Sequence, residues 1–206
     1  MYLTVLKMNK DSLLNNPELE NQLEINSTYA IHQWITECQN RQRHEDNLLY
    51  RIMKRNDEVF LYIQSDMKFC TEGIEKKGLI YLRTIDLNDL FDSVDKDCVH
   101  FDVQVFPYKT LASTHKKVFL SDPEARLDWL KRQLERHGAK LYDKDTYMEY
   151  KLDNIVVDKK GYKRIFLPTS CFKGVLKIED EKKFKEFVNH GFGRCKNFGL
   201  GLVLFR

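Results

Sequence analysis

The chain has 206 residues, which is enough for one large or two small domains. Of these residues, 42% are hydrophobic and 32% are charged. This composition excludes a wholly disordered chain, a collagen and a coiled-coil rod. Its net charge of +3 hides an asymmetry: residues 1–110 carry a charge of −5 and residues 111–206 a charge of +8, and the basic half favours a polyanionic partner. No apolar run is long enough to cross a bilayer, and the N-terminus lacks the pattern of a secretion signal. We therefore expect a soluble, cytoplasmic protein with no membrane partner.

The first half predicts a strand, a helix, a hairpin, a short helix and a strand. Tyr2–Met8 alternates with β-branched residues, as strands do. A helix is expected to begin at Ser27 or Thr28, both of which are competent N-caps. Its apolar stripe at helical spacing consists of Ile31, Trp34, Ile35 and Cys38. The hairpin, the short helix and the last strand are predicted at Leu48–Lys54 with Val59–Ser65, at Leu87–Phe91 and at Val99–Val105.

The second half predicts the same succession. Lys117–Leu120 is a short strand, and Ser121-Asp122-Pro123-Glu124 reads as a capping box that opens a helix ending at Gly138. Residues 147–157 and 162–167 flank the turn Asp158-Lys159-Lys160-Gly161, and the second arm is expected to break at Pro168. Asp180 can cap a further helix. Leu127, Leu130 and Leu134 are expected to face the core from the first helix, Phe184, Phe187 and Val188 from the second, and Leu200–Phe205 is a closing strand.

These elements predict an α+β protein built from two βαββαβ units in tandem. The charge step and the change in composition near Pro107–Ser113 place the boundary so that residues 1–110 form the first domain and residues 111–206 the second. The five cysteines are scattered, with no Cys-x-x-Cys pair and no Cys/His group of the kind that binds zinc, so we expect reduced cysteines, no disulfide framework, no metal site and no cofactor.

His32 lies away from the apolar stripe of the first helix, and Tyr29 precedes it by one turn on the same face. A lone histidine on a helix is usually a surface residue. Two side chains one turn apart, however, can bring their polar groups to the same reacting group. Histidine suits proton transfer near neutral pH, and RNA carries its own nucleophile in the 2′-OH. A base at this hydroxyl and an acid at the departing 5′-oxygen would cleave RNA without a metal, leaving a 2′,3′-cyclic phosphate and a 5′-OH.

The segment from Gly191 to Gly201 holds four of the nine glycines of the chain. Glycines permit positive φ and close backbone approach, and the intervening Arg194 and Lys196 add charge, so the segment is a candidate phosphate-binding loop. The alternative is a helix stop followed by a tight turn. The candidate contacts are Gly191, Gly193, Arg194, Lys196, Gly199 and Gly201.

A second basic cluster lies at the predicted hairpin turn DKKGYKR, where Lys159, Lys160, Lys163 and Arg164 surround a glycine. Such a turn favours phosphate contacts, because the deep, narrow major groove of A-form RNA hinders base readout by a β-ribbon. An ordinary soluble hairpin edge is the alternative. Lys116 and Lys117, at the start of the basic half, complete the candidate RNA contacts.

Four segments of the chain resemble one family, the CRISPR-associated repeat-processing endoribonuclease CasE of the type I-E Cascade complex. They are the opening MYLT, the YAIHQ segment (Tyr29–Gln33), the stretch CFKGVLKIED (Cys171–Asp180) and the final GFGRCKNFGLGLVL, in matching order over nearly the whole chain. MYLT alone is weak, whereas a Tyr-x-x-His helix combined with a C-terminal G-x-G-x-x-K-x-x-G-x-G loop is specific.

The resemblance implies two tandem ferredoxin-like domains and a metal-independent endoribonuclease that binds the hairpin of CRISPR repeat RNA. It implies cleavage of the precursor at the 3′ base of the stem, with retention of the product as a subunit among other Cascade proteins, and we expect a monomer when the protein is isolated. Carried over by position, His32 would be the principal general acid/base and Tyr29 its assistant, while the glycine-rich loop and the hairpin at Lys159 and Lys160 would hold the RNA.

Two other functions fit the same residues. A binding subunit could hold the RNA hairpin for a ribonucleoprotein without cleaving it, because binding rests on distributed phosphate contacts. A protein-interaction module would show no salt-dependent RNA binding.

Overall fold

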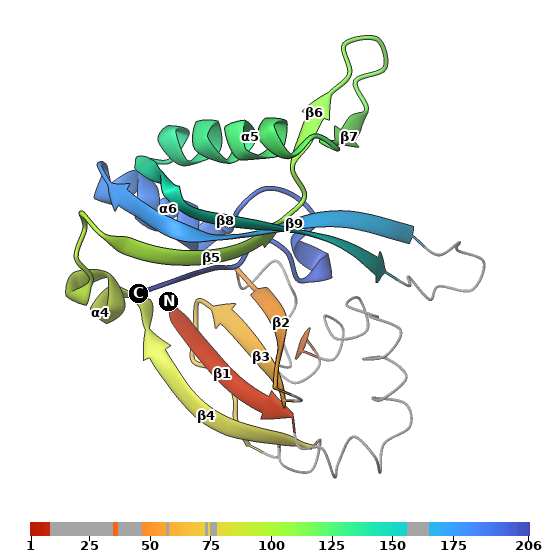
Figure 1. Cartoon of the computed structure of the whole chain (residues 1–206). Helices are drawn as coiled ribbons and strands as arrows, with labels where there is room; N and C mark the ends of the chain where they lie inside the picture. The colour runs from red at the N-terminus through yellow and green to blue at the C-terminus, as the bar shows by residue number, and fades with distance from the viewer. Residues whose placement is uncertain (9–34, 37–46, 57, 73, 75–77, 156–164) are drawn as a thin grey trace. The chain divides into compact units, whose positions relative to one another are not determined.

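The computed structural model describes residues 1–8, 35–36, 47–56, 58–72, 74, 78–155 and 165–206, and these form two compact units (Figure 1). Unit 1 comprises Met1–Asp92, Asn154–Phe166 and Lys196–Gly199, and unit 2 comprises Ser93–Asp153, Leu167–Cys195 and Leu200–Arg206. None of the helices in these described ranges has the length and apolar character to span a membrane.

Unit 1 is built on a four-stranded sheet. Its strands are β1 (Tyr2–Met8), β2 (Leu49–Arg55), β3 (Glu58–Ser65) and β4 (Leu79–Asp86), in the order β2-β3-β1-β4. All neighbouring pairs are antiparallel, and Asn56 adopts a φ of 46° in the turn of the predicted β2–β3 hairpin. The core includes Leu6, Leu61 and Ile63 together with Ile35 of the predicted first helix.

The end of unit 1 differs from the sequence-based prediction. The fourth strand is β4, which was not predicted, because Leu79–Leu82 give it four consecutive apolar residues rather than an alternation. The short helix predicted at Leu87–Phe91 is confirmed as α4 (Leu87–Ser93), but it follows the last strand of unit 1 instead of preceding it.

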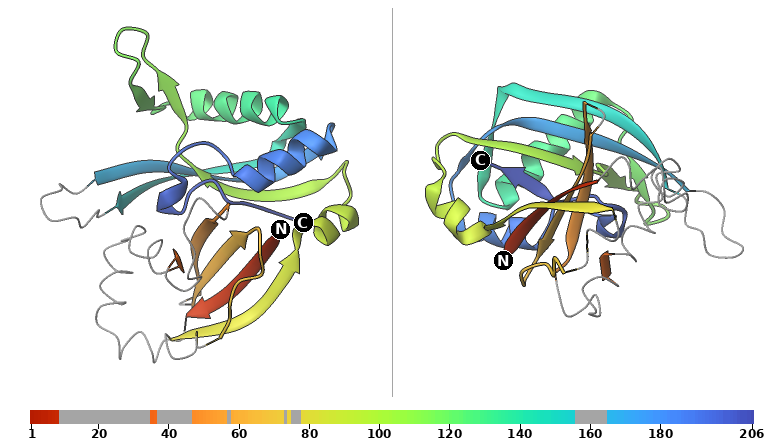
Figure 2. Two further views of the ribbon diagram at one scale, coloured as in Figure 1. Left: turned by 180° about the vertical axis from the view of Figure 1, so that it is seen from behind. Right: turned by 90° about the horizontal axis from the view of Figure 1, so that it is seen from below.

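Unit 2 has the same strand order as unit 1. Its strands are β5 (Val99–Val105), β8 (Ala139–Ile155), β9 (Ile165–Ile178) and β10 (Val203–Phe205), in the order β10-β5-β9-β8. In both sheets the first strand lies between the third and the fourth, as in ferredoxin-like folds. Helices α5 (Pro123–Arg136) and α6 (Glu181–His190) cover one face of the second sheet (Figures 1 and 2). The protein is therefore α+β with two tandem ferredoxin-like units, as expected.

The strand Val99–Val105 belongs to unit 2, although the prediction assigned it to residues 1–110. It hydrogen-bonds to β9 from Val99 to Val105 and to β10 at its centre, so it is the first strand of the second sheet. The compact units accordingly divide between Asp92 and Ser93, ahead of the charge step.

Three smaller expectations in unit 2 are also corrected. Lys117–Phe119 is strand β7, and it pairs with β6 (Tyr108–Thr110) in a separate hairpin instead of joining the sheet. Strand β9 continues through Pro168 without the expected break. Strand β10 is shorter than predicted, although Leu200 and Leu202 before it are buried.

The two helices of unit 2 begin at aspartate caps, and hydrogen bonds join the segment after α5 to the segment before α6. The Ala125 N–H donates to Asp122 Oδ2 (2.7 Å), so the N-cap of α5 is Asp122 and not Ser121 of the expected capping box. The Lys183 N–H donates to Asp180 Oδ1 (3.1 Å), as predicted for α6. Between the helices, the Gly138 carbonyl accepts the N–H groups of both Glu179 (2.8 Å) and Asp180 (3.0 Å).

Helix α5 buries more than the predicted leucine stripe. Leu130 and Leu134 are buried as expected, whereas Leu127 is half-buried. Trp129 and Arg126 are also buried on this helix, and neither was expected in the core. Both residues contact aromatic side chains of unit 2.

Candidate nucleic-acid interface

The predicted site residues divide between described and undescribed parts of the chain. The candidate catalytic pair and the basic hairpin turn lie outside the described residues, and their placement stays a prediction: Tyr29, His32, Lys159, Lys160, Lys163 and Arg164. The structure describes the glycine-rich loop and the two lysines near residue 116. The site is therefore built from these two segments.

The glycine-rich loop starts where helix α6 ends. Gly191 has a φ of 72° and donates its N–H to the Phe187 carbonyl (2.9 Å), so it stops the helix. Phe192 follows, with 1% of its surface exposed, and stacks on Trp129 with ring centroids 5.1 Å apart. The Phe192 N–H donates to the Gly201 carbonyl (2.7 Å) and thereby closes the loop.

Packing explains two of the glycines without any ligand. A Cβ on Gly201, whose φ is +85°, would lie 2.4 Å from the Phe192 carbonyl oxygen. A Cβ on Gly199, whose φ is +75°, would lie 3.1 Å from the Tyr50 ring. Gly193 is different, because its φ of +72° comes with exposure and with only ordinary contacts to Trp129 at 3.7 Å. Among these glycines, Gly193 therefore offers its backbone to a ligand.

The middle of the loop, Lys196–Gly199, belongs to unit 1. Its residues Lys196–Phe198 form the short 3₁₀ helix η3, and the Tyr50 hydroxyl donates to the Asn197 carbonyl (2.9 Å). Lys196 is half-buried there, and this burial lowers the pKa of its ammonium group below the ordinary value. The charged form of Lys196 is thus destabilised in the folded protein.

Replacing Lys196 with methionine is expected to change the pH dependence of stability. Because burial lowers the folded-state pKa, the unfolded chain binds more protons between that pKa and the ordinary value of about 10.4, and wild-type stability rises with pH in this window. The variant should therefore melt above the wild type at pH 7, by an amount within the ~0.5 kcal/mol typical of partly exposed sites. Melting curves between pH 7 and 10 should show this difference shrinking, and a constant difference would contradict the assignment.

Two predicted RNA contacts from distant parts of unit 2 meet at one aromatic ring. The Arg194 guanidinium carbon lies 5.9 Å from the centroid of the Tyr108 ring, and Lys117 Nζ lies 5.2 Å from the same centroid. Arg194 comes from the exposed side of the glycine-rich loop and Lys117 from strand β7, and both side chains are exposed. We call Tyr108, Lys117 and Arg194 the cation–tyrosine cluster.

Further aromatic contacts hold Tyr108 in place. Its ring centroid lies 6.3 Å from that of Trp129 on helix α5 and 6.3 Å from that of Phe106. Cations over an aromatic face are attracted by its quadrupole, which helps to hold two like charges near one point. Such a pair of exposed cations, next in sequence to the exposed Gly193, can bind phosphate groups of a polyanion.

The sequence predicts both cations of this cluster as RNA contacts, but not Tyr108. The signal available was the segment Phe106-Pro107-Tyr108 just before the basic half, whose two aromatic residues do not change the net charge. Lys116, also predicted as an RNA contact, directly precedes Lys117 in the loop of the hairpin and is exposed.

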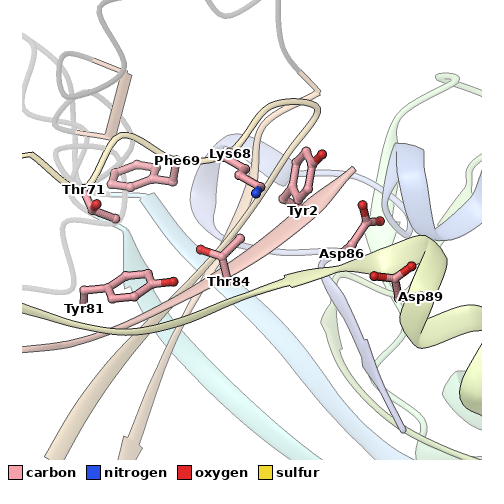
Figure 3. Close-up of a pocket in the computed structure, with 8 residues that line it drawn as sticks. All are labelled: Tyr2, Lys68, Phe69, Thr71, Tyr81, Thr84, Asp86 and Asp89. Carbon is pink, nitrogen blue, oxygen red and sulfur yellow. The ribbon is translucent and has the colours of Figure 1, made fainter.

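The pocket in unit 1 has a different charge. It has a volume of about 530 Å³ and is bounded by aromatic rings of Tyr2, Phe69 and Tyr81 (Figure 3). Its charged groups are the carboxylates of Asp86 and Asp89 and the ammonium group of Lys68, which lies 5.6 Å from the centroid of the Tyr2 ring. Two negative charges against one positive charge disfavour phosphate, and none of the predicted site residues that the structure describes lines this pocket.

Comparison with known proteins relates this fold and these motifs to CRISPR systems. One similar protein is the CRISPR-associated endoribonuclease Cse3 of Thermus thermophilus, 28% identical over 115 residues, which are 51% of this chain and about half (54%) of that relative. A solved structure of the CRISPR endoribonuclease Cse3 bound to a 19-nucleotide RNA matches with a TM-score of 0.80 at 19% identity, covering 100% of this chain and 98% of the other.

A chain of a CRISPR RNA-guided surveillance complex matches with a TM-score of 0.69 at 18% identity, again covering 100% of this chain and 98% of the other. At these identities the solved structures establish the shared fold. The family model described as CRISPR associated protein matches residues 1–206, the full sequence. The chain therefore belongs to the CRISPR-associated protein family, in agreement with its resemblance to CasE.

Proposed function

We propose that this protein is an endoribonuclease that binds the hairpin of CRISPR repeat RNA and cleaves the precursor at the 3′ base of the stem. The observation that carries the proposal is the convergence of Arg194 and Lys117 on the Tyr108 ring, beside the exposed backbone of Gly193. It gives the basic half of the chain an organised phosphate-binding surface instead of scattered solvated charges. Membership of the CRISPR-associated family and the names of the relatives favour RNA as the polyanion.

In this proposal the chemistry belongs to His32 and Tyr29. His32 removes the proton of the 2′-OH or protonates the departing 5′-oxygen, and Tyr29 assists this proton transfer or holds the scissile phosphate. The 2′-oxygen attacks the neighbouring phosphorus as the bond to the 5′-oxygen breaks, which yields a 2′,3′-cyclic phosphate and a 5′-OH. The reaction conserves all atoms of the RNA and requires no metal ion.

The RNA contacts are distributed over the basic half. Among the residues that the structure describes, the RNA contacts are Lys116, Lys117, Arg194 and the loop around Gly193. The basic residues of the predicted hairpin turn are proposed to bind the RNA as well: Lys159, Lys160, Lys163 and Arg164. After cleavage the product stays bound, and the protein remains as a subunit beside other Cascade proteins. The match to a chain of a surveillance complex supports this last step.

The test is incubation of the purified protein with labelled repeat RNA in EDTA, followed by analysis of the product ends. We expect one cut at the 3′ base of the stem, with a 2′,3′-cyclic phosphate on one fragment and a 5′-OH on the other. RNA that binds tightly but stays whole would favour the alternative, a non-catalytic hairpin-binding subunit. The absence of any salt-dependent binding would exclude both functions.

Removing the two cations of the cation–tyrosine cluster should weaken RNA binding in a salt-dependent way. Each lost phosphate contact lowers the slope of log affinity against log salt by about 1, so the double variant Lys117→Ala with Arg194→Ala should lose roughly 2. Filter binding between 50 and 300 mM salt measures this slope. The matched control is Lys140→Ala with Lys182→Ala, which removes two exposed lysines elsewhere in unit 2 and should leave the slope nearly unchanged.

A further inference from the structure

Tyr150 of strand β8 combines high exposure with a fixed environment. Half of its surface (52%) is exposed to solvent. The Arg126 guanidinium carbon lies 5.3 Å from the centroid of its ring, and the Phe119 ring centroid lies 5.9 Å away. An aromatic ring of this size is normally covered when it has such neighbours, because burial of its apolar surface is favourable. Here the neighbours hold the ring while much of it stays open.

Arg126 is an unusual neighbour because it is a buried cation. Only 5% of its surface is exposed, although it lies on helix α5 among apolar side chains. Its Nη1 donates to Ser170 Oγ (3.2 Å), and Nε has no hydrogen-bond partner among the described residues. No carboxylate of the described residues forms an ion pair with Arg126, and a buried charge without such a partner is costly, so the aromatic faces around it must offset part of that cost.

Those faces belong to two different elements. The Arg126 guanidinium carbon lies 5.6 Å from the Phe119 ring of strand β7 and 5.3 Å from the Tyr150 ring of strand β8. The planar guanidinium can stack on both rings, which a lysine ammonium cannot do. Arg126 therefore connects the β6–β7 hairpin, which carries Lys117 and Tyr108, to the exposed tyrosine on β8.

We propose that Tyr150 is a stacking platform for an unpaired nucleobase of the bound RNA, and that Arg126 is the positioning residue that fixes this platform. The inference rests on the proposed function, since the base belongs to the RNA that the basic half binds. A base presents a flat π face whatever its identity, so one exposed and immobilised ring can hold it without reading its sequence. The base docks on the open part of the Tyr150 ring, and its backbone phosphates run toward the cations of the same half.

Another exposed tyrosine of β8 provides the contrast. Tyr147 is 61% exposed, more than Tyr150, but within the described residues it has no recorded ring or cation contact. A ring that must be immobilised on binding loses conformational entropy, whereas Tyr150 is already held. Tyr147 is therefore the matched control for exposure without positioning.

The test uses repeat RNA with a 2′-deoxy group at the cleavage site, so that binding is observed without reaction. 2-Aminopurine replaces each unpaired nucleotide in turn, and its fluorescence reports stacking on the wild-type protein and on variants. We expect quenching at one unpaired position with the wild type and with Tyr150→Phe. Tyr150→Ala should abolish that quenching and weaken RNA binding by about 5- to 140-fold, the range for one lost base–aromatic stack. Tyr147→Ala should change neither quantity.

The role of Arg126 is tested by comparing two substitutions in the same assay. Arg126→Lys keeps a cation over the rings and should retain part of the quenching, whereas Arg126→Met keeps only the bulk and should lose most of it. If Arg126→Met does not fold, the Tyr150 variants still decide the proposal, because Tyr150 is exposed. Wild-type binding and quenching preserved in Tyr150→Ala would overturn this inference alone, whereas a wild-type protein that binds no repeat RNA would overturn the proposed function with it.

Discussion

Replacing His32 with alanine is expected to lower the rate of RNA cleavage by roughly 10²- to 10⁴-fold, the usual loss when a positioned general acid/base is removed. RNA affinity should stay close to that of the wild type, because binding is distributed over phosphate contacts in the basic half of the chain. Single-turnover cleavage in EDTA gives the rate, and binding to uncleavable RNA gives the affinity. The two measurements together separate chemistry from binding.

The matched control for this variant is His100→Ala. His100 is an exposed histidine on strand β5 of unit 2, and its removal should leave the cleavage rate unchanged. Tyr29→Phe tests the partner residue and should slow cleavage if the phenol hydroxyl takes part in proton transfer. Undiminished cleavage by the His32 variant would remove this histidine from the mechanism.

Replacing Gly201 with alanine is expected to destabilise the protein by about 2–5 kcal/mol. A positive φ costs a non-glycine residue about 1–2 kcal/mol, and overpacking of a tight site adds about 1–3 kcal/mol. The new methyl group would lie 2.4 Å from the Phe192 carbonyl oxygen, a backbone atom that cannot rotate away. The Gly201 carbonyl accepts the Phe192 N–H, so the same substitution strains the bond that closes the loop.

Gly193→Ala serves as the comparison because Gly193 has a similar φ of +72°. Its new methyl group would meet only the Trp129 ring at an ordinary distance of 3.7 Å, so the expected loss is about 1–2 kcal/mol from the backbone alone. Urea unfolding of both variants measures the difference. Equal losses would mean that the approach of Phe192 to Gly201 does not constrain the loop.

Local patterns predicted most elements of this fold but not the partners of the strands. The alternation in Val99–Val105 identifies a strand correctly, yet its hydrogen-bond partners lie about 70 and 100 residues further along the chain, at β9 and β10. Nothing in the alternation itself says which sheet a strand joins. The change in net charge near residue 110 placed the predicted domain boundary too far along the chain. Net charge reflects the solvent-exposed residues and not the pairing of strands.

The candidate site shows the same limit. Composition pointed to the glycine-rich loop and to Lys117 and Arg194, but Tyr108 became visible only when the two cations were seen around it. The number of glycines also suggested that all four glycines of the loop share one role, phosphate binding, but in the structure they have different roles. Gly191 ends a helix, Gly199 and Gly201 accommodate close packing, and Gly193 is open to solvent. A spacing motif cannot distinguish these causes, because each requires the same backbone freedom.

The carbonyl of Gly138 has a consequence for folding cooperativity. It accepts both amides that precede helix α6, while a Cβ on Gly138 would lie 2.6 Å from Cβ of Asp180, the residue that caps this helix. The segment after the last turn of α5 and the segment before the first turn of α6 are thus held together. Opening the end of α5 next to Gly138 should therefore also loosen the start of α6, and we expect the two helices to unfold as one cooperative unit.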